Sequence, residues 1–469
     1  MKNSYGKKAL SGAAWKFAER IVAQGVTTVV GIILARLLTP EHYGVIAIVN
    51  IFITICNVFV VTGFGEALIQ KKDADELDFS SIFFVNLFIS VILYVILFFS
   101  APYITLFYGS GYETLTPIIR IMGLRLILAA INSIQHAKVA RDFAFRKYFF
   151  VTLIGTIVSG VVGITFAYLG FGVWALVSQY MTNTIVDTIM LFVFVRWVPK
   201  IQFSYDRIKD LLAYGIRLLS TSLVLTITNE LEQLLIGKKY SPADLAYYSK
   251  GNTYPKLLAN NFSVAISSTI FPLLSKVKDD IDATRKYVSK SIQMISFCIF
   301  PLMMGMFLVA EDFVRIILTE KWLPCVPYLR LICIFYIISS MIIPNSQFLT
   351  SNGYVKVYSK ITYLVRAIGL IVVIVTARLG IIWIAVGRVV VALVEYLLKS
   401  ITAGKRLGYG FFSQIKDMIP NIIGCALMAL SVIIFQNTAS NINVVASFLI
   451  EIIIGASVYI MCAVIIKNP

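Results

Sequence analysis

Fourteen apolar runs, each near the length of a membrane-crossing helix, are the feature that most constrains this chain. A helix of about 20 apolar residues crosses a hydrocarbon core of about 30 Å. Backbone groups inside that core must bond to one another, so only helices and closed barrels can span it. The short alternating strands of a barrel are absent from the sequence. We therefore expect an all-α polytopic membrane protein with spans near residues 12–38, 43–66, 82–107, 115–138, 149–169, 172–195, 211–236, 244–272, 290–318, 326–351, 358–378, 381–400, 418–436 and 443–466.

The distribution of charge sets the expected orientation. Charged residues make up 14% of the chain, against about 25% in a typical soluble domain, yet the formal net charge is +17. Lysines and arginines gather in alternate loops, as in 138–147 and 399–416. Basic loops stay in the cytoplasm, so the basic excess needs no nucleic-acid partner. We expect a multi-pass membrane protein with both termini cytoplasmic.

Several other protein classes lack support in this sequence. The loops are too short to hold a soluble catalytic domain, and no GxxxxGK[ST] nucleotide-binding motif occurs. The six cysteines form no CxxC pair, and the two histidines, His42 and His136, are isolated. The first run carries Lys16 and Arg20 and no small-residue cleavage site, so we interpret it as a retained helix. We expect no enzymatic activity, no metal site and no cofactor.

The chain contains an internal repeat. TPEHYG at 39–44 resembles SPADLA at 241–246, which lies 202 positions later. PIIR at 117–120 matches PYLR at 327–330, which lies 210 positions later. Each match is weak alone, but nearly constant offsets in corresponding spans indicate a real repeat.

The repeat predicts the domain organisation and a mode of action. Two repeats of six helices share one orientation, because six is an even number. Transporters with such halves hold the substrate between them and rock around it, and a channel would more often form from several subunits. We expect an N-lobe over 1–210, a C-lobe over 211–410 and two further helices over 411–469.

Basic residues inside the runs indicate a water-filled cavity. A Lys or Arg at the bilayer centre costs about 2.5–3.5 kcal/mol on insertion scales. Arg125 and Lys256 fall nearest to the middle of their runs, whereas Arg217 lies near an inner end and could reach the interface instead. The cations predicted to line the substrate cavity are Arg20, Arg125, Arg217, Lys250 and Lys256.

The stretch YYSKGNTYPKLLANN at 247–261 is unusually polar for a membrane span. Ser249, Asn252 and Lys256 are joined by steps of three and four residues, so they share one helical stripe. Hydroxyl, amide and ammonium groups suit sugar hydroxyls and phosphate oxygens. The first repeat offset pairs Asn252 with Asn50, which we add to the predicted cavity. The expected cargo is polar and anionic.

Acidic residues inside the runs are fewer. Glu19, Glu230 and Glu232 are candidates for binding a coupling ion, and an intramembrane ion pair explains them equally well. Glu395 lies seven residues after Arg388 on one helical face, which makes it a candidate partner for that arginine.

Five stretches of the chain carry a family resemblance. The sequence resembles the Wzx-type flippases of the polysaccharide transporter branch of the MOP superfamily, near the colanic-acid exporters. The stretches are SGAAWKFAER at 11–20, LARLLTPEHYG at 34–44, GFGEALIQKK at 63–72, FPLLSKVKDD at 271–280 and TEKWLPCVPYLRLIC at 319–333.

The resemblance implies a fold and a task. It implies two six-helix lobes plus two helices around a cationic cavity. It also implies the transfer of an undecaprenyl-diphosphate-linked oligosaccharide from the inner to the outer leaflet of the bacterial cytoplasmic (inner) membrane. It also implies coupling to a proton or sodium gradient, and work alongside a polysaccharide polymerase and export machinery. O-antigen (lipopolysaccharide), capsule, exopolysaccharide and teichuronic-type polymers remain open as the glycan.

Three rival functions fit the sequence less well. An ion-coupled multidrug antiporter of the same superfamily would share the topology, but a cationic drug favours an acidic cavity. A polymerase or ligase would need a large outer loop with reactive groups, and the outer loops are short. A scaffold would not need charges inside its spans.

Overall fold

The computed structural model describes residues 2–62, 68, 74–141, 144–438 and 443–465. The regular structure of these residues is entirely helical, which confirms the all-α prediction. The chain divides into two compact units, Met1–Ala246 and Tyr247–Pro469. Each unit is considered by itself below, and the predicted boundaries at residues 210 and 410 remain predictions.

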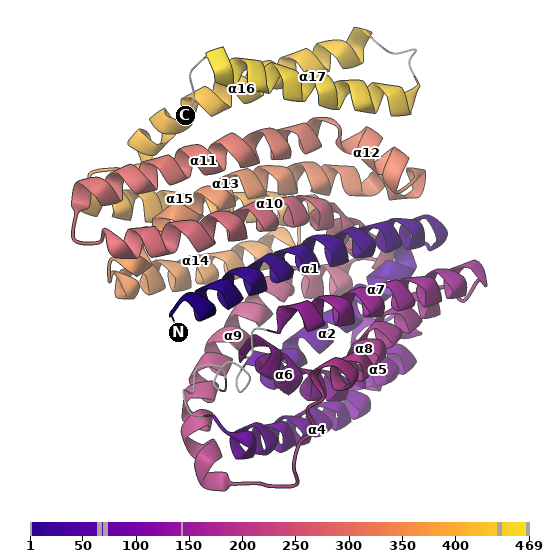
Figure 1. Cartoon of the computed structure of the whole chain (residues 1–469). Helices are drawn as coiled ribbons and strands as arrows, with labels where there is room; N and C mark the ends of the chain where they lie inside the picture. The colour runs from indigo at the N-terminus through magenta and orange to yellow at the C-terminus, as the bar shows by residue number, and fades with distance from the viewer. Residues whose placement is uncertain (1, 63–67, 69–73, 142–143, 439–442, 466–469) are drawn as a thin grey trace. The chain divides into compact units, whose positions relative to one another are not determined.

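The first unit is a bundle of long helices (Figure 1). α7 packs against both α1 and α8, α4 packs against α5 and α6, and α9 packs against α2 and α4. The elements are α1 (Lys2–Leu37), α2 (Pro40–Asn57), the π-helical turn η1 (Val58–Thr62), α4 (Glu76–Tyr108), α5 (Leu115–Gly123), α6 (Arg125–Arg141), α7 (Phe145–Tyr168), α8 (Val173–Val195) and α9 (Tyr205–Lys239).

The second unit is a separate bundle. α10 (Pro242–Lys276) starts in the first unit and continues into the second. α13 packs against α11 and α15, α14 packs against α15, and α16 packs against α11 and α17. The elements are α11 (Ile281–Leu308), α12 (Ala310–Ile317), the 3-10 turn η2 (Glu320–Cys325), α13 (Val326–Ser351), α14 (Val355–Thr376), α15 (Ile381–Leu407), α16 (Phe411–Thr438) and α17 (Val444–Ile465).

The described part of every predicted span lies in one helix or in two consecutive helices. Among the described residues, 11 helical segments are long and apolar enough to cross a membrane. The predicted spans at 12–38, 172–195 and 211–236 are also helical, but they are not among these 11 segments. The protein is therefore a multi-pass helical membrane protein, while the count of 14 spans remains a prediction.

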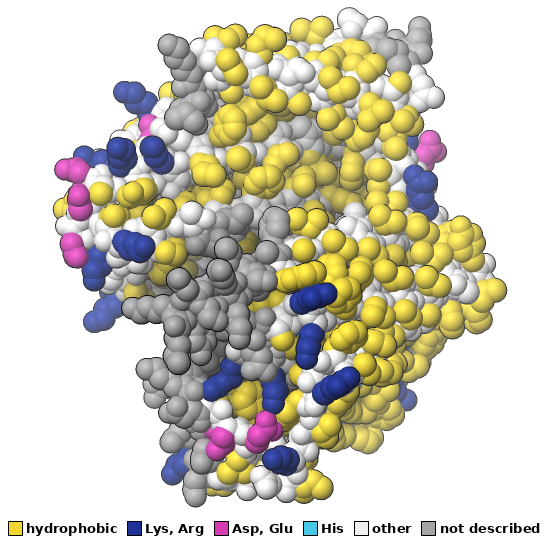
Figure 2. All heavy atoms as spheres, in the orientation of Figure 1, with side chains coloured by type: hydrophobic (Ala, Val, Ile, Leu, Met, Phe, Trp, Pro, Cys, Tyr) yellow, Lys and Arg dark blue, Asp and Glu magenta, His cyan; other side chains and the backbone are white. Residues whose placement is uncertain are grey.

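The surface matches a lipid environment. Hydrophobic side chains cover most of the face seen in Figure 2, where Lys and Arg lie in small groups. Leu106 is 80% exposed and Phe412 is 85% exposed. Water disfavours such surfaces, whereas hydrocarbon accepts them, so these side chains fit a bilayer-facing role.

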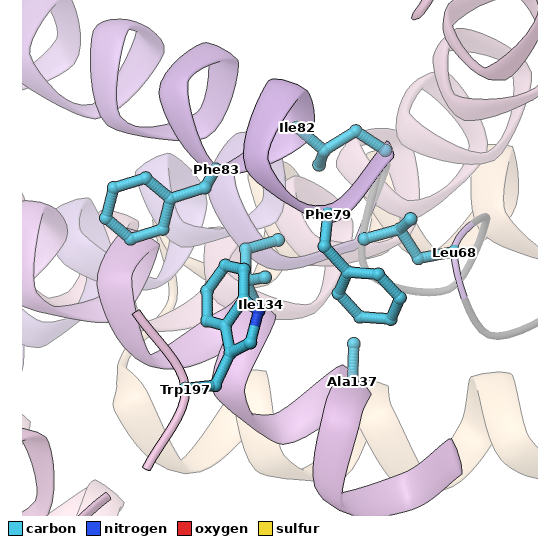
Figure 3. Close-up of a cluster of buried hydrophobic side chains, with 7 residues drawn as sticks. All are labelled: Leu68, Phe79, Ile82, Phe83, Ile134, Ala137 and Trp197. Atoms are coloured by element: carbon cyan, nitrogen blue, oxygen red, sulfur yellow. The ribbon is translucent and has the colours of Figure 1, made fainter. Parts of the chain in front are cut away.

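A compact apolar cluster packs between α4, α6 and the segment that follows α8 in the first unit (Figure 3). Trp197 packs against Phe79 and Phe83, and its indole nitrogen donates to Oε2 of Glu76 at 2.8 Å. Lys138 Nζ lies 2.9 Å from Oε1 of the same Glu76. The cluster therefore joins the segment after α8 to the start of α4 and the end of α6. Its members are Leu68, Phe79, Ile82, Phe83, Ile134, Ala137 and Trp197.

The first copy of the repeated motif packs directly on the second. A methyl group built at Gly44 would lie 1.9 Å from the backbone oxygen of Pro242. Only the missing side chain of Gly44 allows this approach of α2 to the start of α10. The predicted repeat therefore corresponds to a contact inside the first unit.

Candidate functional site

A cavity of about 620 Å³ lies within the first unit. Its wall mixes apolar side chains with amides, hydroxyls, an imidazole, a carboxylate and a guanidinium. A polar pocket inside an apolar bundle is the default binding-site hypothesis. The lining residues are Glu19, Asn57, Val61, Arg125, Ala129, Asn132, Ser133, His136, Ala137, Val139, Ala140, Phe145, Tyr148 and Thr184.

Arg125 is the cation of this cavity among the described lining residues. The predicted span 115–138 is divided at Leu124, so Arg125 begins α6 instead of lying inside one straight helix. Its Nε donates to Oγ1 of Thr184 at 3.2 Å, and its Nη1 donates to Oδ1 of Asn50 at 3.3 Å. The ring of Tyr180 lies 5.0 Å from its Cζ atom. The guanidinium is thus held in place by neutral groups and keeps its full positive charge.

Two amide oxygens in the wall have no hydrogen-bond donor. Oδ1 of Asn57 and Oδ1 of Asn132 are buried, and neither receives a hydrogen bond from the described residues. A buried acceptor without a donor costs about 1–3 kcal/mol. Hydroxyl groups of a ligand, or water, would supply the missing donors. The cavity is therefore built to receive a hydrogen-bond donor as well as an anion.

The acidic side of the cavity lies near Tyr148. Glu19 from α1 lines the cavity together with Tyr148 from α7 and His136 from α6. The rings of His136 and Tyr148 meet edge to face at 4.9 Å. The Tyr148 hydroxyl is close enough to Glu19 and Asp187 to interact with both electrostatically. A cavity with a cation at one point and a carboxylate at another can distinguish the two ends of a polar ligand.

The structure brings three of the predicted residues together. Asn50 and Arg125 are hydrogen-bonded, and Glu19 lines the same cavity as Arg125. Sequence reasoning missed Thr184, Tyr180, Asn57 and Asn132, the neutral groups that hold the cation and line the wall. The signal for them was present, because each is a polar residue inside an apolar run.

The predicted residues of α10 occupy three different environments in the second unit. Lys250 Nζ lies 5.5 Å from the ring of Trp322, which joins α10 to η2. Oδ1 of Asn252 accepts from the Tyr336 hydroxyl at 3.4 Å. Lys256 is exposed. A substrate role for these residues remains a prediction.

The remaining predicted residues lie in α1 and α9. Glu230 accepts a hydrogen bond from Gln233 at 3.2 Å, and Glu232 is half-buried. The side chains of Arg20 and Arg217 lie outside the described residues. Ion binding at Glu230 or Glu232 therefore stays a prediction.

The second unit holds a buried polar network that the sequence analysis did not find. Lys399, whose side chain is 3% exposed, pairs with Oε1 of Glu395 at 2.6 Å and donates to Oγ of Ser346 at 3.0 Å. Glu395 therefore pairs one turn along its own helix, where the sequence had suggested Arg388. The Arg388 Cζ atom lies 4.2 Å from the ring of Phe335.

A second group of bonds joins α13, α15 and α16. The side chains of Asn345 and Gln414 form a reciprocal amide pair with distances of 3.1 and 2.8 Å. Oε1 of Gln414 also accepts from the Tyr396 hydroxyl at 3.1 Å. These groups satisfy one another, so the network holds helices together and offers no vacant partner to a ligand.

Comparison with known protein families identifies the family of this chain. A family model described as "Polysaccharide biosynthesis protein" matches residues 33–327, which is more than half of the chain. The chain belongs to this family. The match confirms the resemblance carried by the five sequence stretches, and the matched residues include Arg125 of the cavity and Lys250 of α10.

Relatives of this family member come from several bacteria. It is 24% identical to the teichuronic acid biosynthesis protein TuaB of Bacillus subtilis, over 75% of this chain and 72% of that protein. It is 22% identical to the lipopolysaccharide biosynthesis protein WzxC of Escherichia coli, over 76% and 73% of the two chains. An uncharacterized membrane protein from the cps region of Klebsiella pneumoniae is 24% identical, over 93% and 90%.

Two solved structures share the fold of this polysaccharide biosynthesis protein. The lipid II flippase MurJ in an inward closed conformation superimposes with a TM-score of 0.78 and 16% identity, over 97% of this chain and 98% of that one. An inward-facing multidrug resistance MATE transporter of the MOP superfamily superimposes with a TM-score of 0.59 and 14% identity, over 82% and 99%. An all-helical fold like that of these two transporters is therefore confirmed.

Proposed function

We propose that this protein is a lipid-linked oligosaccharide flippase, which moves polysaccharide repeat units from the inner to the outer leaflet of the bacterial cytoplasmic membrane. The observation that carries the proposal is a fixed guanidinium, Arg125, in the wall of a 620 Å³ polar cavity inside an apolar helical bundle. Membership in the polysaccharide biosynthesis family supports it, as do relatives named for teichuronic acid and lipopolysaccharide biosynthesis.

The chemistry of the cavity suits the head group of such a lipid. A glycan presents many hydroxyl donors, and the amide oxygens of Asn57 and Asn132 lack donors. A phosphate presents oxygens to Arg125, and charge-assisted bonds of this kind are the strong ones. The apolar tail has no need to leave the bilayer, because the outer surface of the helices is itself apolar.

The finer parts of the proposal extend this picture. The carrier lipid is undecaprenyl diphosphate, the cycle is alternating access, and both termini are cytoplasmic. Two six-helix lobes over 1–210 and 211–410 perform the cycle, with helices over 411–469 added to them. The cations of α1, α9 and α10 assist Arg125, namely Arg20, Arg217, Lys250 and Lys256. A proton or sodium gradient drives transfer through carboxylates such as Glu19, Glu230 and Glu232, and a polymerase and export machinery receive the product.

A multidrug antiporter is the alternative function. Glu19 lines the same cavity as Arg125, and a carboxylate suits a cationic drug. The guanidinium opposes it, because a cation in the wall repels a cationic ligand over a few ångströms. The flippase is therefore the better-supported function.

A deletion strain of the native host tests the proposal. We expect undecaprenyl-diphosphate-linked glycan to accumulate and surface polymer to be lost, with both restored by the wild-type gene and not by an Arg125→Gln variant present at equal membrane level. Unchanged surface glycan in a host without a second flippase would reject the flippase function. A gain in drug sensitivity in that strain would favour the antiporter.

A further inference from the structure

The carboxyl group of Asp187 stands out among the buried ionisable groups of the first unit. It lies on α8, three residues after Thr184, which holds Arg125. Its Oδ1 atom is buried and receives no hydrogen bond from the described residues. Within the part of the chain that the structure describes, no Lys or Arg forms an ion pair with it. Among the described residues, this carboxyl therefore has neither a hydrogen-bond donor nor a counter-ion.

The backbone of α7 is shaped around this carboxyl. A methyl group built at Gly155 would lie 2.1 Å from Oδ1 and 3.1 Å from Cγ of Asp187. Only glycine leaves room for the carboxyl at this point. The notch, which is the close approach of Gly155 to the Asp187 carboxyl, also excludes a hydrated metal ion at Oδ1, since such an ion needs several oxygen ligands around it. A proton needs no such space.

The carboxyl and the cavity have Tyr148 as a common neighbour. Tyr148 lies on α7, two helical turns before Gly155, so the two residues share a face. The Tyr148 hydroxyl interacts electrostatically with Asp187 on one side, and Tyr148 lines the cavity on the other. The other ionisable groups nearby are Glu19 from α1 and, on the cavity side, Arg125 and His136 from α6. α2 contributes the neutral Asn50.

We propose that Asp187 is a proton-binding site of the first unit, loaded and emptied from the cavity past Tyr148. A buried carboxylate without a donor or counter-ion is costly, and a proton removes its charge. In the loading step a hydronium ion in cavity water transfers its proton to the carboxylate, an O–H bond forms, and a water molecule remains. Emptying reverses the step. The site deepens the proposed function, on which it rests only for the use that transport makes of the proton.

Infrared difference spectroscopy on the purified full chain in lipid nanodiscs tests the site. Spectra are compared between about pH 5 and about pH 9, a range in which ordinary carboxyls are mostly ionised and strongly perturbed carboxyls titrate. We expect the wild type to show a protonated-carboxyl band that is lost as the pH rises. Asp187→Asn should lack that band. The control Asp417→Asn should keep it, because Asp417 already accepts from Ser289 and Tyr409 at 2.5 and 2.6 Å.

A second variant keeps the test valid if Asp187→Asn fails to fold. Gly155→Ala pushes the carboxyl out of its notch, so the band should titrate at lower pH than in the wild type. A wild-type band that survives in Asp187→Asn, or the absence of any titrating band, would overturn the proposal. Failure of the flippase assay would leave these spectra unchanged, so the two failures can be told apart.

Discussion

The two units place similar polar residues in opposite conditions. In the first unit, the side-chain oxygens of Asn57 and Asn132 line a cavity and receive no hydrogen bond from the described residues. The guanidinium of Arg125 is held only by neutral groups. In the second unit, Lys399 has a carboxylate partner and Asn345 forms a reciprocal pair with Gln414. Unsatisfied groups around a space can bind a ligand, whereas satisfied groups between helices bind only each other. The two regions use similar basic and amide side chains, so they differ in the hydrogen-bond and ion-pair partners of those side chains.

Removing the buried cation of the second unit should give the largest loss of stability. Lys399→Met leaves Glu395 without its partner, and an uncompensated buried charge costs about 3–5 kcal/mol of the free energy of unfolding. Thermal unfolding in detergent measures the loss. The double variant Lys399→Met with Glu395→Gln should recover most of it. A single variant as stable as the wild type would show that the pair is not a structural bond.

Two asparagines provide the direct comparison of the two regions. Asn345→Ala removes a reciprocal amide pair and leaves Gln414 with unpaired groups, so we expect a loss of about 1–3 kcal/mol. Asn132→Ala removes an oxygen that has no donor, so we expect no loss of stability and a gain of up to about 1–3 kcal/mol. Unfolding of the two variants side by side tests this. Equal losses would contradict the distinction between satisfied and unsatisfied groups.

The cavity cation should matter more to transport than to stability. Arg125→Gln keeps a hydrogen-bonding side chain but removes the charge, so we expect unfolding to change by about 1 kcal/mol. Export of glycan should fall about tenfold or more, the effect of losing one charge-assisted bond to the cargo. Surface polymer is measured at matched membrane levels. Arg125→Lys serves as the charge-retaining control, and full export by Arg125→Gln would reject the role.

The exposed cation of α10 should give the smallest effect on stability. Lys256 is exposed, so Lys256→Ala should change the free energy of unfolding by no more than about 0.5 kcal/mol. If it lines the substrate path as the sequence predicts, export should nevertheless be lost. Membrane insertion and surface polymer are measured together. Normal polymer in the variant would remove Lys256 from the proposed path.

The division of a predicted span shows why the candidate site was only partly predictable. Hydropathy places Arg125 inside one run, 115–138, because an average over a window does not detect a helix break. The structure ends α5 before Leu124 and starts α6 at Arg125. The contact with Asn50 brings together positions 75 residues apart, and the repeat had selected Asn50 for another reason. The charged residues of the site could thus be predicted from the sequence, but the neutral groups that hold them could not.

Asp187 shows the same limit for the acids. The sequence has Asn183, Thr184, Met190 and Leu191 at the positions three and four residues away, so no local partner could neutralise the carboxyl. That signal was available, yet it could not exclude a partner from another helix. Only the packing of α8 on Gly155 of α7 shows that the described residues supply none.

The sequence by itself determined that this protein is helical and spans a membrane, roughly where its helices lie along the chain, and to which family it belongs. Those properties follow from hydropathy, charge in loops and short local motifs, which act over neighbouring residues. Only the tertiary structure decided which polar groups are satisfied. That depends on contacts between helices distant in the chain, as between Arg125 and Thr184. A basic residue, an asparagine or a carboxylate therefore forms a structural contact in one unit and offers a binding group in the other.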